Sequence, residues 1–216
     1  LLAVIIYLWR DLWSITAALI DFRNLQQSPD LKLAKLIIIA SIPVMILGLI
    51  ISLISDNLMR SVEVIGWATL GFGILLGISD KIGLAVSDLR HMGIGDAFLI
   101  GVSQALALIP GASRAGLTIT MARFLGYDRK TAARFSLLLA IPAILGASTL
   151  KGIELVGADD LILGIDVLIA VSVSFLAALA SISIMMAWLT RVGFMPFVIY
   201  RVILGVALLI WVYTQS

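Results

Sequence analysis

Long hydrophobic runs, separated by short polar stretches, make up most of this 216-residue chain. The runs 36–54 and 194–213 have about the 20 residues that an α-helix needs to cross the hydrocarbon core of a bilayer. The run 161–189 is long enough to cross with a tilt, and the run 64–79 reaches the required length if residues 61–63 add a further turn. Each of these four runs therefore predicts a membrane-spanning helix.

A fifth span is predicted after the polar turn near residue 128. Asp128 is expected to cap a helix that runs through Arg134 to Leu150, and Pro142 is expected to kink it.

The first 35 residues are predicted to enter and leave this set of spans. Residues 1–9 are apolar but too few to cross a bilayer. We interpret residues 1–20 as the end of a first span whose start precedes Leu1, followed by an interfacial segment. The polar stretch 21–35 is predicted to be a cytoplasmic connection.

Residues 97–125 contain two apolar runs, 97–109 and 117–125, that are each too short to span, and Pro110-Gly111 breaks the pattern between them. We predict a re-entrant hairpin of two half-helices, the first capped by Asp96. Irregular backbone at membrane depth is tolerated only where protein or a water-filled cavity surrounds it. The break in this hairpin is therefore the predicted place for a binding site.

The distribution of basic residues favours a hairpin over a single crossing at 97–125. If the loop 10–35 is cytoplasmic and each full span changes side, ten basic residues lie in inner loops and two in outer loops, in line with the positive-inside rule. The inner residues are Arg10, Arg23, Lys32, Lys35, Lys81, Arg90, Arg129, Lys130, Arg134 and Arg191, and the outer residues are Arg60 and Lys151. A single crossing would move the basic loop 126–134 outside.

The composition agrees with an integral membrane protein. Hydrophobic residues make up 62% of the chain and charged residues 13%, whereas soluble domains have about 25% charged residues. The net charge of +2 gives no basic patch for nucleic acid. Cysteine is absent and His91 is the single histidine, which excludes thiolate and histidine-cluster metal sites and leaves His91 as a solvated surface residue.

The predicted fold is therefore an all-α, polytopic transmembrane helical bundle, with residues 1–216 forming a single membrane domain. Ile42-Pro43 and Ile141-Pro142 each lie in a span with a glycine four or five residues later. Because transporter-like folds often break helices in pairs, this similarity between the two spans leads us to expect an inverted repeat.

The sequence around Pro110 has the features of an anion site. Arg114 lies between the two half-helices, where a charge costs about 2.5–3.5 kcal/mol and is a functional hypothesis by default. Gly111 and Gly116 allow a tight turn whose amide groups form an anion nest beside a helix N-terminus. Ser113 and Thr118 add hydroxyl groups within a turn of Arg114. Gln104, on the incoming half-helix, could face the same cavity.

The competing interpretation is that Pro110-Gly111 only breaks a helix and that Arg114 extends to the interface. For the two other arginines near membrane depth, similar explanations are sufficient. Arg123 either extends to the interface or adds charge behind the site. Arg201 pairs with Asp166 or extends to the interface.

Three stretches carry a resemblance to a known family. The segment A-L-A-L-I-P-G-A-S-R-A-G-L-T-I, the run at 132–147 and the ending F-M-P-F-V-I-Y-R at 194–201 resemble the undecaprenyl-pyrophosphate phosphatase family, also known for bacitracin resistance. The resemblance covers essentially the whole chain. It implies a bacterial inner-membrane enzyme that removes the terminal phosphate of undecaprenyl pyrophosphate and so recycles the lipid carrier of cell-wall synthesis. Its partners would be this lipid and the surrounding membrane lipids, and no nucleic acid is expected. The protein could form a homodimer.

The resemblance also assigns roles to residues. Arg114 and Ser113 would be the catalytic pair, and the phosphate-binding positions would be Gly111, Ala112, Ala115, Gly116, Thr118 and Gln104. The family usually has serine at the position of Ala115, so one hydroxyl contact would be lost. The family's second motif, E-x-x-x-E leading to P-V-S-S-x-G-H, is not found in this sequence and would precede Leu1.

The absent motif affects the expected chemistry. Mg²⁺ or Ca²⁺ would assist, with its ligands in the absent motif and none in this sequence. Residues 104–118 contain no carboxylate, so we expect the 216-residue chain alone to be inactive. The alternative functions are a polyprenyl-phosphate flippase or an anion-coupled transporter, because transporters hold anions at broken helices in the same way. A purely structural membrane subunit is the third, and it gives no reason for Ser113-Arg114.

Overall fold

The computed structural model describes residues 1–20, 28–54, 61–84, 87–157, 165–189 and 191–215. The regular secondary structure in these ranges is helical, with one isolated bridge between Ser87 and Tyr127. The α-helices are α1 (Leu2–Tyr7), α2 (Trp9–Ile20), α3 (Pro29–Ile54), α4 (Val62–Ile82), α5 (Ile94–Ala105), α6 (Arg114–Phe124), α7 (Arg129–Gly157), α8 (Ile165–Trp188) and α9 (Met195–Gln215). Two short 3₁₀ helices, η1 (Leu89–His91) and η2 (Leu106–Leu108), precede and follow α5.

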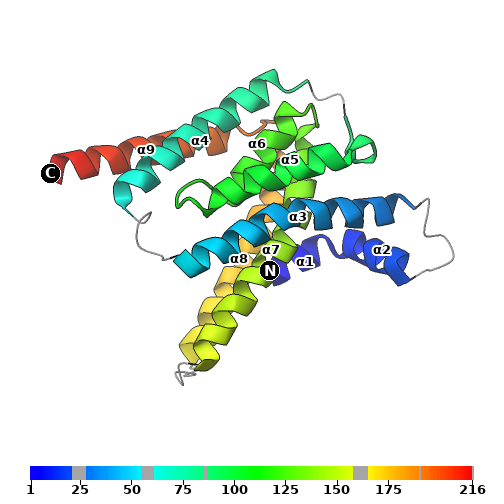
Figure 1. The fold of residues 1–216 in the computed structure, drawn as a ribbon. Coiled ribbons are helices and arrows are strands. Elements are labelled where there is room, and N and C mark those ends of the chain that lie inside the picture. Colours follow the sequence, from blue (N-terminus) through cyan, green and yellow to red (C-terminus); the bar gives the residue numbers. More distant parts are fainter. Residues whose placement is uncertain (21–27, 55–60, 85–86, 158–164, 190, 216) are drawn as a thin grey trace.

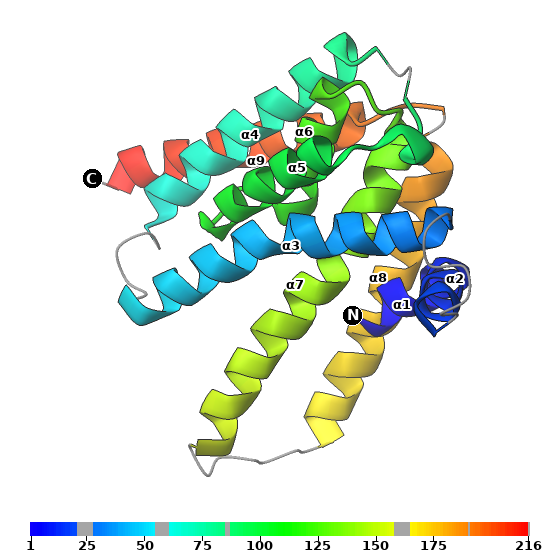
Figure 2. The same ribbon diagram turned by 45° about the vertical axis from the view of Figure 1, so that its right-hand side comes forward.

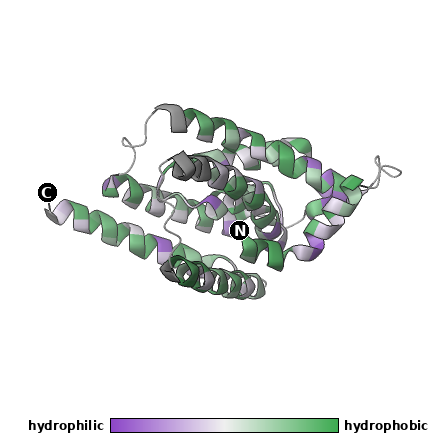
Figure 3. Ribbon diagram, turned by 90° about the horizontal axis from the view of Figure 1, so that it is seen from below, coloured by the Kyte–Doolittle hydropathy of each residue, from purple (hydrophilic) through white to green (hydrophobic). Residues whose placement is uncertain are grey.

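Five helices are long and apolar enough to cross a membrane, which confirms the five predicted spans. The membrane-length stretches are Pro29–Ile50, Val62–Ile82, Arg129–Thr149, Val167–Trp188 and Met195–Thr214. None of the residues 167–188 of α8 is buried, although their mean hydropathy is 2.5. Figure 3 shows apolar residues along most of the long helices and hydrophilic residues in short stretches. Such apolar outer surfaces are suited to contact with lipid rather than water.

The helices form two groups around the central pair α5 and α6. Helices α4 and α9 lie side by side, whereas α7 and α8 both extend away from the rest but stand apart from each other, with α1 in contact with both (Figures 1 and 2). Helix α5 packs on α3, and α6 packs on α4 and α7, so that the α5–α6 pair lies between α4 and α3 (Figures 1 and 2). The predicted hairpin therefore lies between long apolar helices, and one face of α5, with Phe98, Leu99 and Val102, stays exposed.

Several helices begin earlier than the hydrophobic pattern indicates. Helix α3 starts at Pro29 instead of residue 36, because the Ser28 hydroxyl accepts a hydrogen bond from Leu31 N (3.2 Å) and proline is favoured at a first helical position. The prediction of a connection over 21–35 is thus wrong for its last seven residues, and residues 21–27 lie outside the described ranges. Residues 1–20 form two helices, α1 and α2. That they are the end of a first span followed by an interfacial segment stays a prediction.

The hairpin is closed at its base by Asp96 and Tyr127. Asp96 is not the N-cap that the sequence analysis predicts, because α5 starts three residues earlier than expected. Asp96 Oδ2 instead accepts hydrogen bonds from Gly93 N (3.1 Å) and from the Tyr127 hydroxyl (2.6 Å). Burial, together with this hydrogen bond, raises the pKa of Tyr127, so the phenol stays protonated and continues to donate. Asp128 caps α7 as predicted, accepting from the amides of residues 130 and 131.

A buried carboxylate, Asp80 at the end of α4, joins four helices at the same end of the molecule. Arg129 donates to both of its oxygens (2.7 and 3.0 Å), and Phe194 N donates to Oδ2 (3.2 Å). Arg123, only 2% exposed, lies 3.6 Å from Asp80 Oδ1 and donates to three backbone carbonyls around it. Arg123 therefore does not extend to the interface as one interpretation expected. It fixes the end of α6 to α4.

The crossing of α3 and α5 depends on a glycine, which gives a testable prediction. A Cβ added at Gly101 would overlap the carbonyl oxygen of Ala40, which real atoms cannot tolerate. We expect Gly101→Ala to destabilise the protein by about 1–3 kcal/mol, because the two helices must separate. Thermal unfolding in detergent measures the effect.

Gly95 provides the matched control on the same helix. A Cβ at Gly95 has nothing within 4 Å, so Gly95→Ala should leave stability unchanged or raise it by up to about 1 kcal/mol. Equal melting temperatures for the two variants would show that the α3–α5 contact is not as close as described.

Candidate functional site

The α5–α6 connection turns back sharply at residues 109–113. Helix α5 continues through η2, Ala112 N donates to Ile109 O (3.2 Å), and α6 begins at Arg114. Gly111 has φ +88°, and a Cβ there would lie 2.6 Å from Ile65 O of α4. Only glycine satisfies both the left-handed backbone and this close approach. The turn therefore rests directly on the first turns of α4.

Ser113 holds the turn in a strained conformation. Its φ of 63° is the one positive value among the non-glycine residues that the structure describes, and such a conformation costs about 1–3 kcal/mol. The Ser113 hydroxyl caps α6 by accepting a hydrogen bond from Gly116 N (3.2 Å). Because the side chain is exposed, its hydroxyl hydrogen stays available to a ligand. Strain of this kind persists where the surrounding structure enforces it, often at functional sites.

Arg201 of α9 holds the two residues that precede Ser113. Its Nη2 donates to Gly111 O (2.7 Å) and Ala112 O (3.1 Å), and Thr69 Oγ1 donates to the same Gly111 oxygen (3.2 Å). The side chain passes over Gly73 of α4, where a Cβ would lie 2.9 Å from Arg201 Cβ. The prediction that Arg201 extends to the interface is therefore wrong. The alternative partner, Asp166, has its side chain outside the described residues.

The direction of the Ala112 carbonyl leaves the Ser113 amide on the opposite side of the turn. In a trans peptide the N–H points opposite to the preceding C=O, so the Ser113 N–H points away from Arg201. Within the described part of the chain, the amides of Ser113, Arg114 and Ala115 donate to no protein acceptor. Consecutive unpaired amides at a helix N-terminus attract an anion. This row of three amides is called the amide nest below.

The sequence pattern predicts that Arg114 lies in the break between the two half-helices. In the structure, Arg114 is instead the first residue of α6. Its side chain is half-buried and lines a cavity of about 520 Å³ between α3 and α7. No ion pair between a carboxylate and either Arg114 or Arg201 is found among the described residues. Two guanidinium groups without carboxylate partners thus flank the same turn, an arrangement that favours a multiply charged anion.

The remaining predicted residues have different surroundings. Ala112 is buried in the turn, whereas Ala115 is exposed beside the amide nest. The Thr118 hydroxyl is buried and engaged with Ser136 Oγ (2.7 Å) and the carbonyls of Arg114 and Ala115, so its phosphate-binding role stays a prediction. Gln104 is 1% exposed and both atoms of its amide lack a partner. A buried amide without partners is costly unless water or a ligand satisfies it.

Side chains that could hold a divalent cation do not cluster among the described residues. No group of three or more acidic or histidine side chains that could hold a metal is found in the described ranges. His91, predicted to be a surface residue, is exposed and paired with Asp88 Oδ1 (2.7 Å), which lowers the pKa of that carboxyl. The turn offers amides, hydroxyls and guanidinium groups, which are ligands for anions rather than for metal ions.

The sequence analysis missed Arg201 and Thr69 as parts of the site. Arg201 is separated from Gly111 by 90 residues and Thr69 by 42, and no local pattern connects such positions. An arginine six residues into an apolar span was the available signal, because a charge at that depth needs partners inside the protein.

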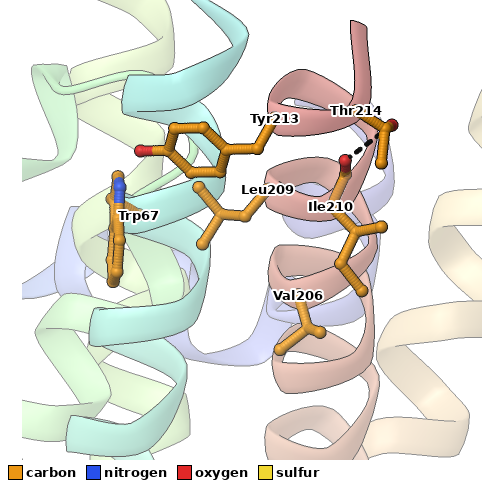
Figure 4. Close-up of a pocket in the computed structure, with 6 residues that line it drawn as sticks. All are labelled: Trp67, Val206, Leu209, Ile210, Tyr213 and Thr214. Carbon is orange, nitrogen blue, oxygen red and sulfur yellow. Dashed lines mark hydrogen bonds between the residues drawn. The ribbon is translucent and has the colours of Figure 1, made fainter. Parts of the chain in front are cut away.

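A second hollow, on the outer surface of α4 and α9, differs in character. It is lined by Trp67, Val206, Leu209, Ile210, Tyr213 and Thr214 (Figure 4). The Thr214 hydroxyl donates to Ile210 O (2.8 Å), as the dashed line shows. This hollow has no charged side chain in its wall and so offers nothing to hold an anion.

Comparisons with known proteins identify a family and several similar proteins. The family model described as bacitracin resistance protein BacA matches residues 1–207. Undecaprenyl-diphosphatase 1 of Rhodospirillum rubrum is 43% identical over 212 residues, which cover 98% of this chain and 75% of the relative. The undecaprenyl-diphosphatases of Roseobacter denitrificans and Jannaschia sp. are 44% and 46% identical over 216 and 217 residues, which cover 99% and 98% of this chain and 81% and 80% of those relatives.

Proposed function

The chain belongs to the undecaprenyl-diphosphatase family, also described as bacitracin resistance protein BacA, and from this premise we propose that the turn at residues 109–114 binds the diphosphate of undecaprenyl diphosphate. The reaction adds water across the phosphoanhydride bond: a water oxygen forms a bond to the terminal phosphorus, and the bond to the bridging oxygen breaks. Undecaprenyl phosphate and inorganic phosphate are the products. The enzyme acts in a bacterial inner membrane, where its products serve the lipid cycle of cell-wall synthesis.

The observation that carries the proposal is the amide nest with its two flanking guanidinium groups. The transferred phosphoryl group spreads negative charge over its oxygens in the transition state, and catalysis depends mainly on positioning and charge stabilisation. The free amides of Ser113, Arg114 and Ala115 and the Arg114 side chain supply donors for these oxygens. The Ser113 hydroxyl can donate to the same group. Arg201 holds the turn and adds positive charge from behind.

The placement of the turn supports a site in the outer half of the membrane. The turn packs against Ile65 and Thr69, which lie near the end of α4 that the basic-residue count assigns to the outside. The α5–α6 pair would then be a hairpin that enters from the cytoplasmic side, reaches past the midplane and returns. We also propose that the protein has an inverted repeat and that it forms a homodimer.

The test of the function is release of phosphate by the protein at its full natural length, purified in detergent. We expect phosphate to be released from undecaprenyl diphosphate but not from undecaprenyl phosphate, because undecaprenyl phosphate has no phosphoanhydride bond to cleave. The same assay on the 216-residue chain tests the expectation that it is inactive alone. A full-length protein that releases nothing would contradict the proposal.

A second candidate function is transport of a lipid phosphate or another anion, favoured by the helix N-terminus that points at the turn. Movement of a fluorescent lipid phosphate across vesicles containing the protein measures it. Transport without phosphate release would place this function first.

A divalent cation is part of the proposal as a companion of the diphosphate. We expect removal of Mg²⁺ and Ca²⁺ with EDTA to lower phosphate release by about tenfold or more, because the cation neutralises charge on the diphosphate. Adding Mg²⁺ or Ca²⁺ back should restore the rate. Undiminished activity after exhaustive chelation would remove the cation from the proposal.

A further inference from the structure

The hollow on the surface of α4 and α9, called the α4–α9 hollow below, lies over a close crossing of these two helices. A Cβ at Gly66 would lie 2.9 Å from Leu209 Cδ2, and a Cβ at Gly205 would lie 2.8 Å from Leu70 N. Small residues at such a crossing let two membrane helices approach closely. Leu209 belongs both to this crossing and to the wall of the hollow, so the hollow is built on a tight contact between the two helices.

The wall of the α4–α9 hollow suits a hydrocarbon chain. Figure 4 shows Tyr213 and Leu209 extending from α9 toward Trp67 and α4. The α9 residues follow the spacing of one helical stripe; they are Val206, Leu209, Ile210, Tyr213 and Thr214. The Thr214 hydroxyl is satisfied within its own helix. The volume of about 400 Å³ lies within the range of roughly 300–1,000 Å³ that is usual for pockets that bind small molecules.

A carboxylate lies just beyond this apolar wall. Glu63 precedes Trp67 by one turn of α4, and its Oε1 accepts a hydrogen bond from the Tyr213 hydroxyl (2.6 Å). Both side chains are exposed. Within the described part of the chain, no basic side chain forms an ion pair with Glu63. Its charge is therefore available to a cation that comes from outside the protein.

The end of α9 adds negative potential at the same place. Helix α9 ends at Gln215, two residues after Tyr213, and its last turn contains no basic residue. The last carbonyls of a helix carry the negative end of its dipole, about half an elementary charge. Glu63 lies in the first turn of α4 and so offsets the positive end of that helix. This end of the hollow thus attracts a cation and repels an anion.

We propose that the α4–α9 hollow binds a phospholipid with a primary ammonium headgroup, with part of an acyl chain in the hollow and the ammonium group on Glu63. Helices α4 and α9 are both of membrane length, so lipid covers this face. A primary ammonium group has three N–H donors, which match the carboxylate and the carbonyls at the end of α9. The site is separate from the turn at residues 109–114 and does not depend on the proposed function.

The headgroup chemistry separates this lipid from its neighbours in a membrane. A choline headgroup has the same charge but no N–H group, so it cannot donate a hydrogen bond to Glu63. A glycerol headgroup has no positive charge and leaves the lipid phosphate facing a carboxylate, which repels it. Binding to the hollow should therefore decrease from phosphatidylethanolamine to phosphatidylcholine and phosphatidylglycerol.

The experiment measures quenching of Trp67 fluorescence by brominated lipids. The protein at its full natural length, with every tryptophan except Trp67 replaced by phenylalanine, is placed in phosphatidylcholine vesicles. These vesicles contain brominated phosphatidylethanolamine, phosphatidylglycerol or phosphatidylcholine. We expect phosphatidylethanolamine to bind about threefold to fivefold more strongly than the other two lipids, which is the effect of a partly exposed ion pair.

Variants identify the group that selects the lipid. Glu63→Gln removes the charge but keeps an oxygen that can accept from Tyr213, so the preference should disappear. Asp30→Asn, in the first turn of α3, removes a carboxylate elsewhere and should keep the preference. Val206→Phe fills the hollow from its apolar wall and should weaken quenching by phosphatidylethanolamine to the level of the other lipids. If melting temperatures show that Glu63→Gln does not fold, Val206→Phe decides.

A second reporter separates the hollow from the bilayer around it. Trp211 is exposed on α9 but lies outside the stripe that lines the hollow. A protein in which Trp211 is the only tryptophan should show no preference among the three lipids. A preference of equal size at Trp211 would belong to the whole surface and would overturn the proposal.

The remaining results are equally clear. Equal quenching of Trp67 by the three lipids, or a preference that survives Glu63→Gln, would overturn the proposal. Stronger quenching by phosphatidylcholine would indicate an aromatic site for a quaternary ammonium group, which also contradicts it. None of these results bears on the phosphatase function, because that function is tested by phosphate release and not by lipid binding at the α4–α9 hollow.

Discussion

Arg114→Ala is expected to lower phosphate release from undecaprenyl diphosphate by about a hundredfold to a thousandfold, the effect of removing one preorganised donor to a developing oxyanion. Arg114 is the first residue of α6, has no carboxylate partner among the described residues and lies between the amide nest and the α3–α7 cavity. Its charge is therefore available to the substrate. Steady-state kinetics in detergent measure the effect.

Arg114→Lys should recover only part of the rate, because an ammonium group keeps the charge but lacks the planar fork that matches two phosphate oxygens. The control is Arg90→Ala, since Arg90 is exposed on η1 and far in sequence from the turn; its rate should equal that of the wild type. If Arg114→Ala keeps more than half of the activity, the guanidinium does not stabilise the reacting phosphate.

Arg201→Met is expected to reduce the same activity by about a hundredfold, because small displacements of groups that position a reacting centre have effects of this size. Methionine fills a similar apolar volume but leaves Ala112 O without a donor and Gly111 O with Thr69 alone. The turn should then relax from the strained conformation at Ser113. Arg201 acts through the turn, so it is a positioning residue.

A role in positioning is distinguished from general stability by comparing variants. The rate of phosphate release by Arg201→Lys should lie between the rates of Arg201→Met and the wild type, since one ammonium group can reach the carbonyls without donating as a fork. Arg191→Met, at an exposed arginine before α9, should be normal. The loss in Arg201→Met should appear mainly in kcat while the protein melts near the wild-type temperature. If kcat falls only in those variants whose melting temperature falls as well, the result would contradict the positioning role.

Some parts of the candidate site could be predicted from sequence because they are local. Gly111, Ser113 and Arg114 lie within four residues, and a charge beside a Pro-Gly break in a short apolar run indicates an anion site without knowledge of the fold. The detailed role of Ser113 could not be predicted in this way. Its hydroxyl caps α6, and this depends on a backbone conformation that a non-glycine residue adopts only when other parts of the protein enforce it.

Other parts depend on contacts between distant segments. The closeness of Arg201 to the turn follows from the packing of α9 on α4, where Gly73 leaves room for the side chain. Thr118 shows that a position suggested by sequence spacing can have other contacts in the fold. Its spacing from Arg114 suggests a ligand contact, whereas its hydroxyl is buried against Ser136 of α7. Side-chain type and spacing alone do not distinguish these outcomes.

The sequence by itself determined the number of membrane-length helices, the position of the broken hairpin and the identity of its arginine. These features depend on the length of apolar runs and on local turn chemistry, which act over a few residues. Only the tertiary structure decided that Arg201 and Thr69 hold the turn, that Asp80 joins four helices and that a cavity opens beside Arg114. Lipid-facing helices are all similarly apolar, so their pairing is set by small residues and buried polar contacts between segments far apart in the chain, and these contacts have no local signature.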